Sequence, residues 1–208
     1  HANQGKILTE KSVAMIAPLL LAQPEFAVVD VLDDQPVDYD LDEFRNFPFD
    51  YNTNHICRWY FHMYGITADL GKPWLRVTPD ISFKNEIVIA RSFRYRAPGI
   101  RYDFLQAYPH ITFVGLKEEY EDLKQSIPGL KHRTVSDFLE FAQIIAGCKF
   151  FIGNQSFPFA VAEALKVPRA LELCFECRNV IPEGPDAYDF LYQPQFEKVV
   201  KQLNQLSK

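Results

Sequence analysis

The sequence predicts an α/β protein built around a parallel sheet, and three observations lead to this fold class. From residue 86 onward, short apolar runs recur along the chain. A segment with apolar residues at helical spacing follows most of these runs. Gly, Pro or small polar residues separate the two kinds of segment. Such alternation is typical of parallel strands that are joined by right-handed crossovers.

The part before this alternation, residues 1–85, is expected to begin with a helix and a strand. Apolar side chains at helical spacing predict an amphipathic helix that ends before Pro24. These side chains are Val13, Ile16, Ala17, Leu20 and Leu21. Residues 26–32 predict a strand, and we expect the acidic residues between 33 and 43 to form a solvated surface loop. A metal site is the alternative for these acids, but it requires carboxylates that converge in space.

A second helix and a connector complete this first part. Residues 56–64 predict a helix that Gly65 ends. His55 and His62 lie seven residues apart, but no third metal ligand is evident, so we interpret both as surface or core residues. Residues 65–85 show no clear period and are expected to form the connector.

The second part, residues 86–208, is expected to be a compact Rossmann-like unit of about four or five parallel strands with helices on both faces. The expected strands are 86–90, 111–114, 130–135, 150–152 and 170–173. The expected helices are 102–108, 118–125, 136–146 with Ser136 as its N-cap, 158–165 and 196–203. The domain boundary therefore falls at residue 85 or 86.

Composition and missing motifs exclude several classes of function. The 208 residues carry a net charge of −5, which argues against a nucleic-acid surface built on bulk charge. No apolar run is long enough to predict a membrane span, and the first residues show no signal-peptide pattern, so we expect a cytoplasmic protein. The four cysteines are interpreted as ordinary reduced thiols. Without a Gly-x-Gly-x-x-Gly or Walker A loop, a nicotinamide dehydrogenase is disfavoured and no cofactor is expected. No metal is expected either, because the sequence has no second pair of zinc ligands beside Cys174 and Cys177.

Three loops after expected strands hold the candidate binding residues, because parallel topology brings such loops to one sheet edge. The first loop carries Ser92 and four arginines in a chain that is otherwise acidic. These arginines are Arg91, Arg94, Arg96 and Arg101. Arg binds phosphate or carboxylate through paired hydrogen bonds, so the loop indicates an anion site. The alternative is a set of surface arginines that pair with nearby acids.

The other two loops add a turn, carboxylates and short polar side chains. Gly115 permits a tight turn into the next helix, where Glu118 and Glu119 suit either the helix dipole or a ribose hydroxyl. The third loop, with Asn154, Gln155 and Ser156, opens a helix, so it suits either a phosphate or helix capping. In that helix, Glu163 either lies on the solvent face or faces a ligand.

Four segments carry a resemblance to a known family: 88–92 (Val-Ile-Ala-Arg-Ser), 112–119, 138–156 and 162–168. From Ile87 onward the chain resembles the donor-binding half of GT-B glycosyltransferases, and most of all the ADP-heptose–lipopolysaccharide heptosyltransferase family. In that family a helix leads into a strand that ends in a Gly-Asn-Asp-Ser-Gly loop, on which the nucleotide sugar sits. The resemblance implies a GT-B sheet and a nucleotide-diphosphate sugar bound by the three loops.

The chain also departs from the family pattern. Asn154, Ser156 and Pro158 match it, whereas Gln155 stands for Asp, Phe157 for Gly and Ala160 for His. Glu163 is similar in position to a helix glutamate that contacts the ribose in other GT-B enzymes. The family's opening Gly-Asp-x-x-x-x-Leu-Pro motif, whose Asp is the expected base, has no counterpart here, and Asp30 is the one substitute. We therefore expect residues 1–85 to be an incomplete lobe, and the chain to be a fragment or divergent member without full activity.

Two functions stay open from the sequence. The first is a hexosyl- or heptosyl-transferring enzyme that binds a nucleotide-diphosphate sugar and deprotonates an acceptor hydroxyl. The second is a non-enzymatic module that binds a sugar or nucleotide, or a protein partner, on the same fold. We expect no nucleic-acid partner, and an open edge strand would permit a homodimer. The sequence specifies neither the base, the sugar nor the acceptor.

Overall fold

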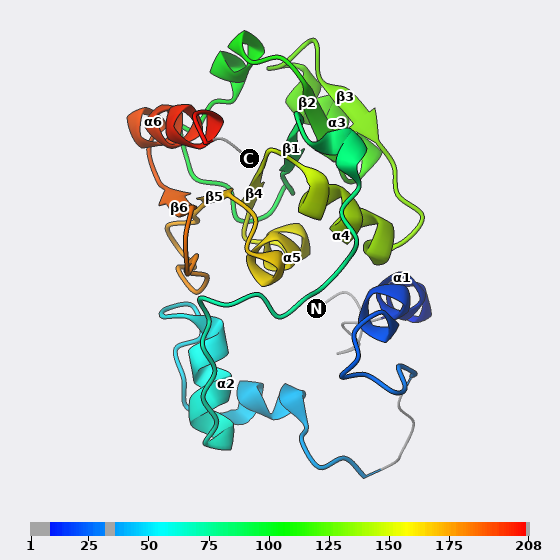
Figure 1. Ribbon diagram of the computed structural model, residues 1–208. Coiled ribbons are helices and arrows are strands. Elements are labelled where there is room, and N and C mark those ends of the chain that lie inside the picture. The colour runs from blue at the N-terminus through cyan, green and yellow to red at the C-terminus, as the bar shows by residue number, and fades with distance from the viewer. Residues whose placement is uncertain (1–8, 32–35, 207–208) are drawn as a thin grey trace.

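The centre of the protein is a six-stranded parallel sheet (Figure 1). The computed structural model describes residues 9–31 and 36–206. The strands are β1 (Ile87–Ala90), β2 (Ile111–Val114), β3 (Lys131–Arg133), β4 (Phe150–Asn154), β5 (Arg169–Glu172) and β6 (Ala187–Phe190). Their spatial order is β3-β2-β1-β4-β5-β6, and every neighbouring pair is parallel. This is the order of a doubly wound α/β sheet, and it confirms the expected α/β class with a parallel sheet.

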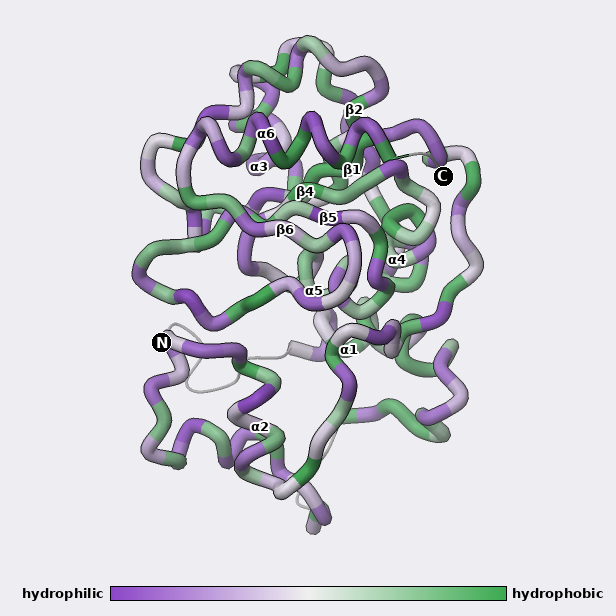
Figure 2. The backbone as a smooth tube through the Cα atoms, turned by 60° about the vertical axis from the view of Figure 1, so that its left-hand side comes forward, coloured by the Kyte–Doolittle hydropathy of each residue, from purple (hydrophilic) through white to green (hydrophobic). Residues whose placement is uncertain are grey.

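The central strands are apolar along their whole length because both faces of the sheet are covered. All four residues of β1 are buried, and Ile89 lies opposite Phe113 of β2 and Ile152 of β4. Figure 2 shows hydrophobic residues along β1 and β2 in the middle of the molecule. The β-branched and aromatic residues in these short runs therefore favour strand formation at the centre of the sheet.

Helices cover the two faces of the sheet in two groups. The 3-10 helix η3 (Asp103–Ala107), α3 (Lys117–Lys124) and α6 (Gln193–Asn204) pack against the face that carries Ile87 and Ile89. On the face of Val88 and Ala90 lie α4 (Phe138–Gly147), α5 (Phe157–Leu165) and α1 (Glu10–Leu21). The helix α1 lies beside α4, with Leu19 in the shared core (Figure 1).

Most expected elements of the second part occur within a few residues of their expected bounds, but two details were wrong. The sheet has six strands rather than four or five, because β6 was not expected. Three of its four residues are only half-buried, so its sequence lacks an apolar run. The cap of α4 is Asp137, whose carboxylate accepts from the Glu140 backbone N–H at 2.9 Å. Ser136 instead donates its hydroxyl to the Glu140 side chain at 2.8 Å.

The described residues before β1 form helices and no strand. They are α1, the 3-10 helix η1 (Leu41–Asn46), α2 (Ile56–Tyr64), ended by Gly65 at φ 63°, and the 3-10 helix η2 (Ile81–Phe83). The strand expected at 26–32 is wrong for residues 26–31, where Phe26, Val28 and Val31 are exposed. A strand requires a hydrogen-bonded neighbour, and none of the described residues supplies one here. Leu32, Asp33 and Asp34 lie outside the described residues.

The connector is fixed to the second part by backbone hydrogen bonds. Trp74 N–H donates to the Ala164 carbonyl of α5 at 3.0 Å, and Asp80 N–H donates to the Gln143 carbonyl of α4 at 2.9 Å. The buried Gln23 side chain, just after α1, exchanges two hydrogen bonds with the backbone of Arg76 at 2.8 and 3.2 Å. Because backbone pairing is specific in direction, the connector is held in one path over α4 and α5.

Candidate functional site

The chain order reverses between β1 and β4, and ligands of open α/β sheets bind at the carboxyl ends of such strands. The fully buried Asn154 side chain joins the two loops at this point. Its Oδ1 accepts from Ser92 N–H at 3.0 Å, and its Nδ2 donates to the Ser92 carbonyl at 3.0 Å and to the Arg94 carbonyl. The loops after β1 and β4 therefore meet at one sheet edge, as parallel topology predicts.

Arg91 is engaged by the protein rather than free for a ligand. Its Nε and Nη2 donate to the two oxygens of the buried Glu172 carboxylate at 2.6 and 2.7 Å. The same carboxylate accepts from Ala97 N–H at 2.8 Å and from the Tyr102 hydroxyl at 2.9 Å. Burial, together with the Glu172 charge, raises the pKa of Tyr102 well above its ordinary value, so its hydroxyl stays a donor. This network joins the end of β5 to the loop after β1.

The side chains of Gln155 and Ser156 also form hydrogen bonds within the protein. The Gln155 Oε1 accepts from Cys174 N–H at 2.6 Å, and its Nε2 donates to the Cys177 carbonyl at 2.5 Å and to Asn179 Oδ1 at 3.1 Å. This position therefore requires a side chain that both donates and accepts hydrogen bonds, and an ionised aspartate only accepts them. Ser156 precedes α5 but makes no side-chain cap, and its hydroxyl donates to the Asn154 carbonyl at 3.1 Å.

Glu163 lies at the centre of a buried ionic cluster. Its Oε2 accepts from Arg169 Nε at 2.5 Å, and its Oε1 pairs with Lys166 and accepts from Glu183 N–H at 3.1 Å. Arg169 is fully buried, and its other nitrogens donate to the Val167 and Glu183 carbonyls. The cluster ties α5 to β5 and to the loop that precedes β6.

The loop after β2 approaches the same edge through Glu119. Burial raises the pKa of the Glu119 carboxyl, which accepts hydrogen bonds from the backbone of Leu116 and Phe93. A Cβ on Gly115 would lie 2.9 Å from the Phe113 ring, so the strand-to-helix turn requires glycine. Glu118 is exposed in the first turn of α3, where its charge suits the helix dipole.

At this edge Arg94 has no ionic partner in the described chain, and Arg96 is only partly engaged by the protein. Arg94 is exposed, lies 5.7 Å from the Tyr95 ring centre, and has no ionic partner among the described residues. Arg96 pairs with Asp122 at 2.8 Å and donates from Nε to the Ser92 carbonyl at 2.9 Å. Its Nη2 is buried without a hydrogen-bond partner in the described part of the chain. A buried N–H donor without an acceptor is unfavourable, so this nitrogen favours an added anion or water.

These cations line an open hollow of about 530 Å³. Its lining comes from the loops after β1 and β5: Phe93, Arg94, Tyr95, Arg96, Pro98, Cys174, Phe175 and Glu176. Phe93, Tyr95 and Phe175 are exposed aromatic side chains, and such rings provide faces on which planar groups stack. The sequence alone did not single out the contribution of the loop after β5.

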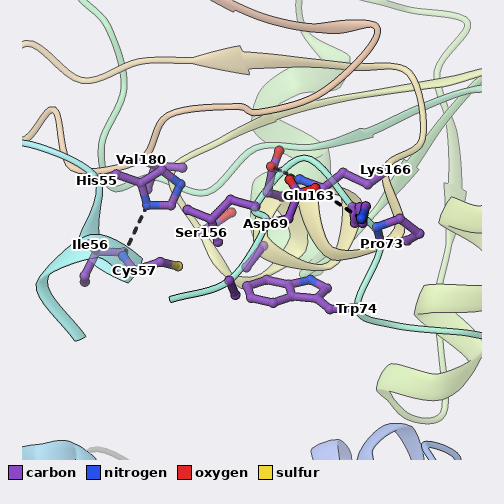
Figure 3. A pocket seen from close by; sticks show the side chains of 14 residues that line it. His55, Ile56, Cys57, Asp69, Pro73, Trp74, Ser156, Glu163, Lys166 and Val180 are labelled. Carbon is purple, nitrogen blue, oxygen red and sulfur yellow. Dashed lines mark hydrogen bonds and ion pairs between the residues drawn. The ribbon is translucent and has the colours of Figure 1, made fainter. Parts of the chain in front are cut away.

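A second cavity of about 180 Å³ lies between the start of α2, the connector and α5 (Figure 3). Its lining includes Ser156 and Glu163, together with His55, Trp74 and Lys166. The candidate residues therefore do not all line one space. Arg94 faces the hollow, Ser156 and Glu163 face the second cavity, and Gly115 lines neither. Arg101 is exposed in a further depression with Arg91 and Arg96.

The residues that the structure describes contain no group of three or more His, Cys, Asp or Glu side chains that could hold a metal ion. Cys57, Cys174 and Cys177 form no disulfide. Within residues 9–31 and 36–206, no helix combines the length and the apolar character that crossing a bilayer requires.

Fold and site together define a doubly wound α/β protein with a cationic hollow at the carboxyl edge of its sheet. No family model and no curated protein matches the chain. It is similar to a solved glycosyl transferase family 9 protein from Veillonella parvula DSM 2008, with 15% identity and a TM-score of 0.45. The similarity covers 75% of this chain and 54% of that one, so the chain spans about half the length of that protein. The fold class rests on the strand order of the chain itself.

Proposed function

We propose that this chain binds a nucleotide-diphosphate sugar in the hollow at the carboxyl edge of its sheet, as a divergent relative of GT-B glycosyltransferases. The observation that carries this proposal is the pair of arginines without full partners, Arg94 and Arg96, at the strand-order reversal of an acidic chain. A guanidinium group holds a diphosphate through paired, charge-assisted hydrogen bonds.

The remaining lining supports the same class of ligand. Phe93, Tyr95 and Phe175 provide exposed rings on which a base or a sugar can pack. The volume of about 530 Å³ lies within the range of small-molecule sites. In this proposal residues 86–208 form the donor-binding domain, and residues 1–85 belong to a second lobe with the connector.

Replacing Arg94 with Ala should weaken the binding of a nucleoside diphosphate by about 1.5–3 kcal/mol, the contribution of a charge-assisted hydrogen bond. This corresponds to roughly a 10- to 150-fold rise in Kd. Isothermal titration calorimetry with ADP, UDP and GDP measures the change. Arg45→Ala is the matched control, because Arg45 lies in η1 and pairs with Asp42. Equal affinity of the Arg94→Ala variant and the wild type would remove Arg94 from the site.

Sugar transfer is the second candidate function, and the position of Glu176 favours it. This exposed carboxylate lines the same hollow and has no hydrogen-bond or ionic partner among the described residues. As a general base it would take the proton of an acceptor hydroxyl. The hydroxyl oxygen would then bond to the anomeric carbon, while the bond from that carbon to the diphosphate oxygen breaks and the nucleoside diphosphate leaves with the electron pair.

If transfer occurs, Glu176→Gln should lower the rate of diphosphate release by about 10²- to 10⁴-fold and leave nucleotide affinity unchanged. The assay follows diphosphate release from a panel of nucleotide sugars with and without acceptor sugars. Binding without release in the wild type would instead identify a binding module. Turnover that Glu176→Gln retains in full would place the base elsewhere.

We further propose a cytoplasmic setting, because cysteines outside disulfides, such as Cys57, Cys174 and Cys177, are typical of reducing compartments. A homodimer would use an edge strand of the sheet. Exposed Lys131 and Arg133 on β3 oppose edge-to-edge pairing, so β6 is the edge that we propose for such a contact. Cross-linking through a cysteine placed on β6 measures this contact.

A further inference from the structure

The cavity between α2, the connector and α5 is separate from the proposed nucleotide hollow, and the two share no lining residue. Most of its wall is apolar, from Ile56, Leu70, Pro73, Ala160 and Val180, with Trp74 along one side. Figure 3 shows His55 and Trp74 in different parts of this wall. Nothing in the nucleotide proposal uses this space.

The volume of this cavity suits a small ligand. The volume is about 180 Å³, and an engineered apolar cavity of about 150 Å³ accepts benzene. Sites for drug-sized molecules begin at about 300 Å³. The cavity is open to solvent beside Trp74, which is 50% exposed, and its inner volume fits one six-membered ring.

One hydrogen-bond donor without a partner comes from His55, which lines this space. His55 Nδ1 accepts the Cys57 backbone N–H at 3.1 Å and so caps α2. Burial lowers the pKa of His55, so its ring is neutral near pH 7, and because Nδ1 accepts, the single proton lies on Nε2. This Nε2–H has no partner among the described residues, although only 4% of the residue surface is exposed. Figure 3 shows one ring nitrogen turned to the Cys57 backbone, and the other lies away from it.

The charged groups in the wall are already neutralised by one another. Glu163 pairs with Lys166 and Arg169, and Lys166 also donates to the Glu183 carbonyl at 3.1 Å. Asp69 pairs with Lys72 at 3.5 Å. A charged ligand would lose its hydration without gaining a free partner of opposite charge. The cavity therefore favours an uncharged molecule.

We propose that this cavity binds a neutral molecule with one six-membered ring, apolar over most of its surface, that accepts a single hydrogen bond from His55 Nε2–H. The ring packs against Trp74 and the aliphatic wall, which supplies most of the affinity through removal of apolar surface from water. A sugar ring is a poor fit, because most of its hydroxyl groups would be buried without partners.

Benzene and pyridine test this proposal, because they have the same shape and differ by one acceptor nitrogen. The diagnostic variant is His55→Asn, since Asn is a strong N-cap residue that keeps the Cys57 contact and lacks the Nε2–H. We expect pyridine to bind about tenfold more weakly to His55→Asn than to the wild type, the effect of one hydrogen bond. Benzene affinity should agree within about twofold between the two proteins, since benzene makes no such bond. Ligand-observed NMR titrations at pH 7.5 measure all four Kd values.

A second variant, Ala160→Leu, places a larger side chain on the exposed part of the wall that α5 contributes and should weaken the binding of both rings at least tenfold. Nucleoside diphosphate affinity should stay unchanged in both variants, so failure here is distinguishable from failure of the proposed nucleotide site. Full binding of both rings to Ala160→Leu would overturn the proposal. So would equal losses of benzene and pyridine in His55→Asn, no binding of either ring to the wild type, or tighter binding of glucose than of pyridine.

Discussion

Replacing Glu172 with Gln should lower the free energy of unfolding by about 3–5 kcal/mol, the usual result of removing one partner of a buried ion pair. The Glu172 side chain is fully buried, and it accepts from Arg91, Ala97 and Tyr102. Glutamine keeps the volume but has one acceptor oxygen and one NH₂ group. At least one of these donors would then face another donor, and the Arg91 charge would stay buried without a counter-charge.

Urea denaturation followed by circular dichroism measures this loss as a lower midpoint at an unchanged slope. Glu25→Gln is the matched control, because Glu25 pairs with Arg76 at the surface, where both side chains are more than half exposed. Exposed pairs contribute about 0–1 kcal/mol, so the control should stay near the wild type. Equal stabilities of the Glu172→Gln and Glu25→Gln variants would show that the buried network is not required.

The same substitution connects stability to the proposed site. Glu172 ends β5 and holds Arg91 and Ala97, which flank Arg94 and Arg96 in the loop after β1. Loss of the network would release that loop from the sheet. We therefore expect nucleotide affinity to fall together with stability in Glu172→Gln, although Glu172 lines none of the hollow.

Replacing Gly147 with Ala should lower the free energy of unfolding by about 3 kcal/mol or more. A Cβ at this last residue of α4 would lie 1.9 Å from the carbonyl oxygen of Asp80 and 2.6 Å from its carbonyl carbon. Alanine is better than glycine in a helix by about 1 kcal/mol, but a clash with backbone cannot be relieved by a side-chain rotation. The connector would have to move away from α4, which would also weaken the hydrogen bond from Asp80 N–H to the Gln143 carbonyl.

Gly129→Ala is the control for this prediction. Nothing lies within 4 Å of a Cβ at Gly129, and its φ is not in the left-handed region. This variant should match the wild type or gain up to about 1 kcal/mol, because alanine restricts the unfolded chain. A Gly147→Ala protein whose thermal midpoint equals that of Gly129→Ala would contradict the close approach of the connector to α4.

The central elements could be predicted because a strand that is buried on both faces has a continuous apolar sequence. The runs of β1, β2 and β4 are apolar throughout, and the inner face of α6 repeats at helical spacing. β6 was missed because Ala187, Tyr188 and Asp189 are only half-buried at the edge of the sheet. At residues 26–31 the opposite error occurred: a strand was predicted where none forms. Apolar residues alone do not form a strand without a hydrogen-bonded neighbour.

The candidate site was predicted in its location but not in the roles of its residues. Arg91 and Arg94 belong to one loop and look equivalent in the sequence. Arg91 is engaged by Glu172, which lies 81 positions away, whereas Arg94 is exposed. Similarly, Asn154 and Gln155 appeared to be ligand-binding residues, but their amides hold the neighbouring loops. His55 was considered in the sequence only together with His62 and was interpreted as a surface or core residue; the structure buries it.

The sequence by itself determined the α/β class, the buried strands and the edge of the sheet at which polar loops gather. Periodicity, strand length and parallel topology are local or additive properties, so the linear order of residues is sufficient for them. Only the tertiary structure decided which polar groups are hydrogen-bonded within the protein and which can still bind a ligand. That outcome depends on long-range partners: Glu172 satisfies Arg91, while Arg96 Nη2 and His55 Nε2 meet no acceptor in the described chain. A hydrogen bond requires two groups at one distance and angle, which only the folded arrangement specifies.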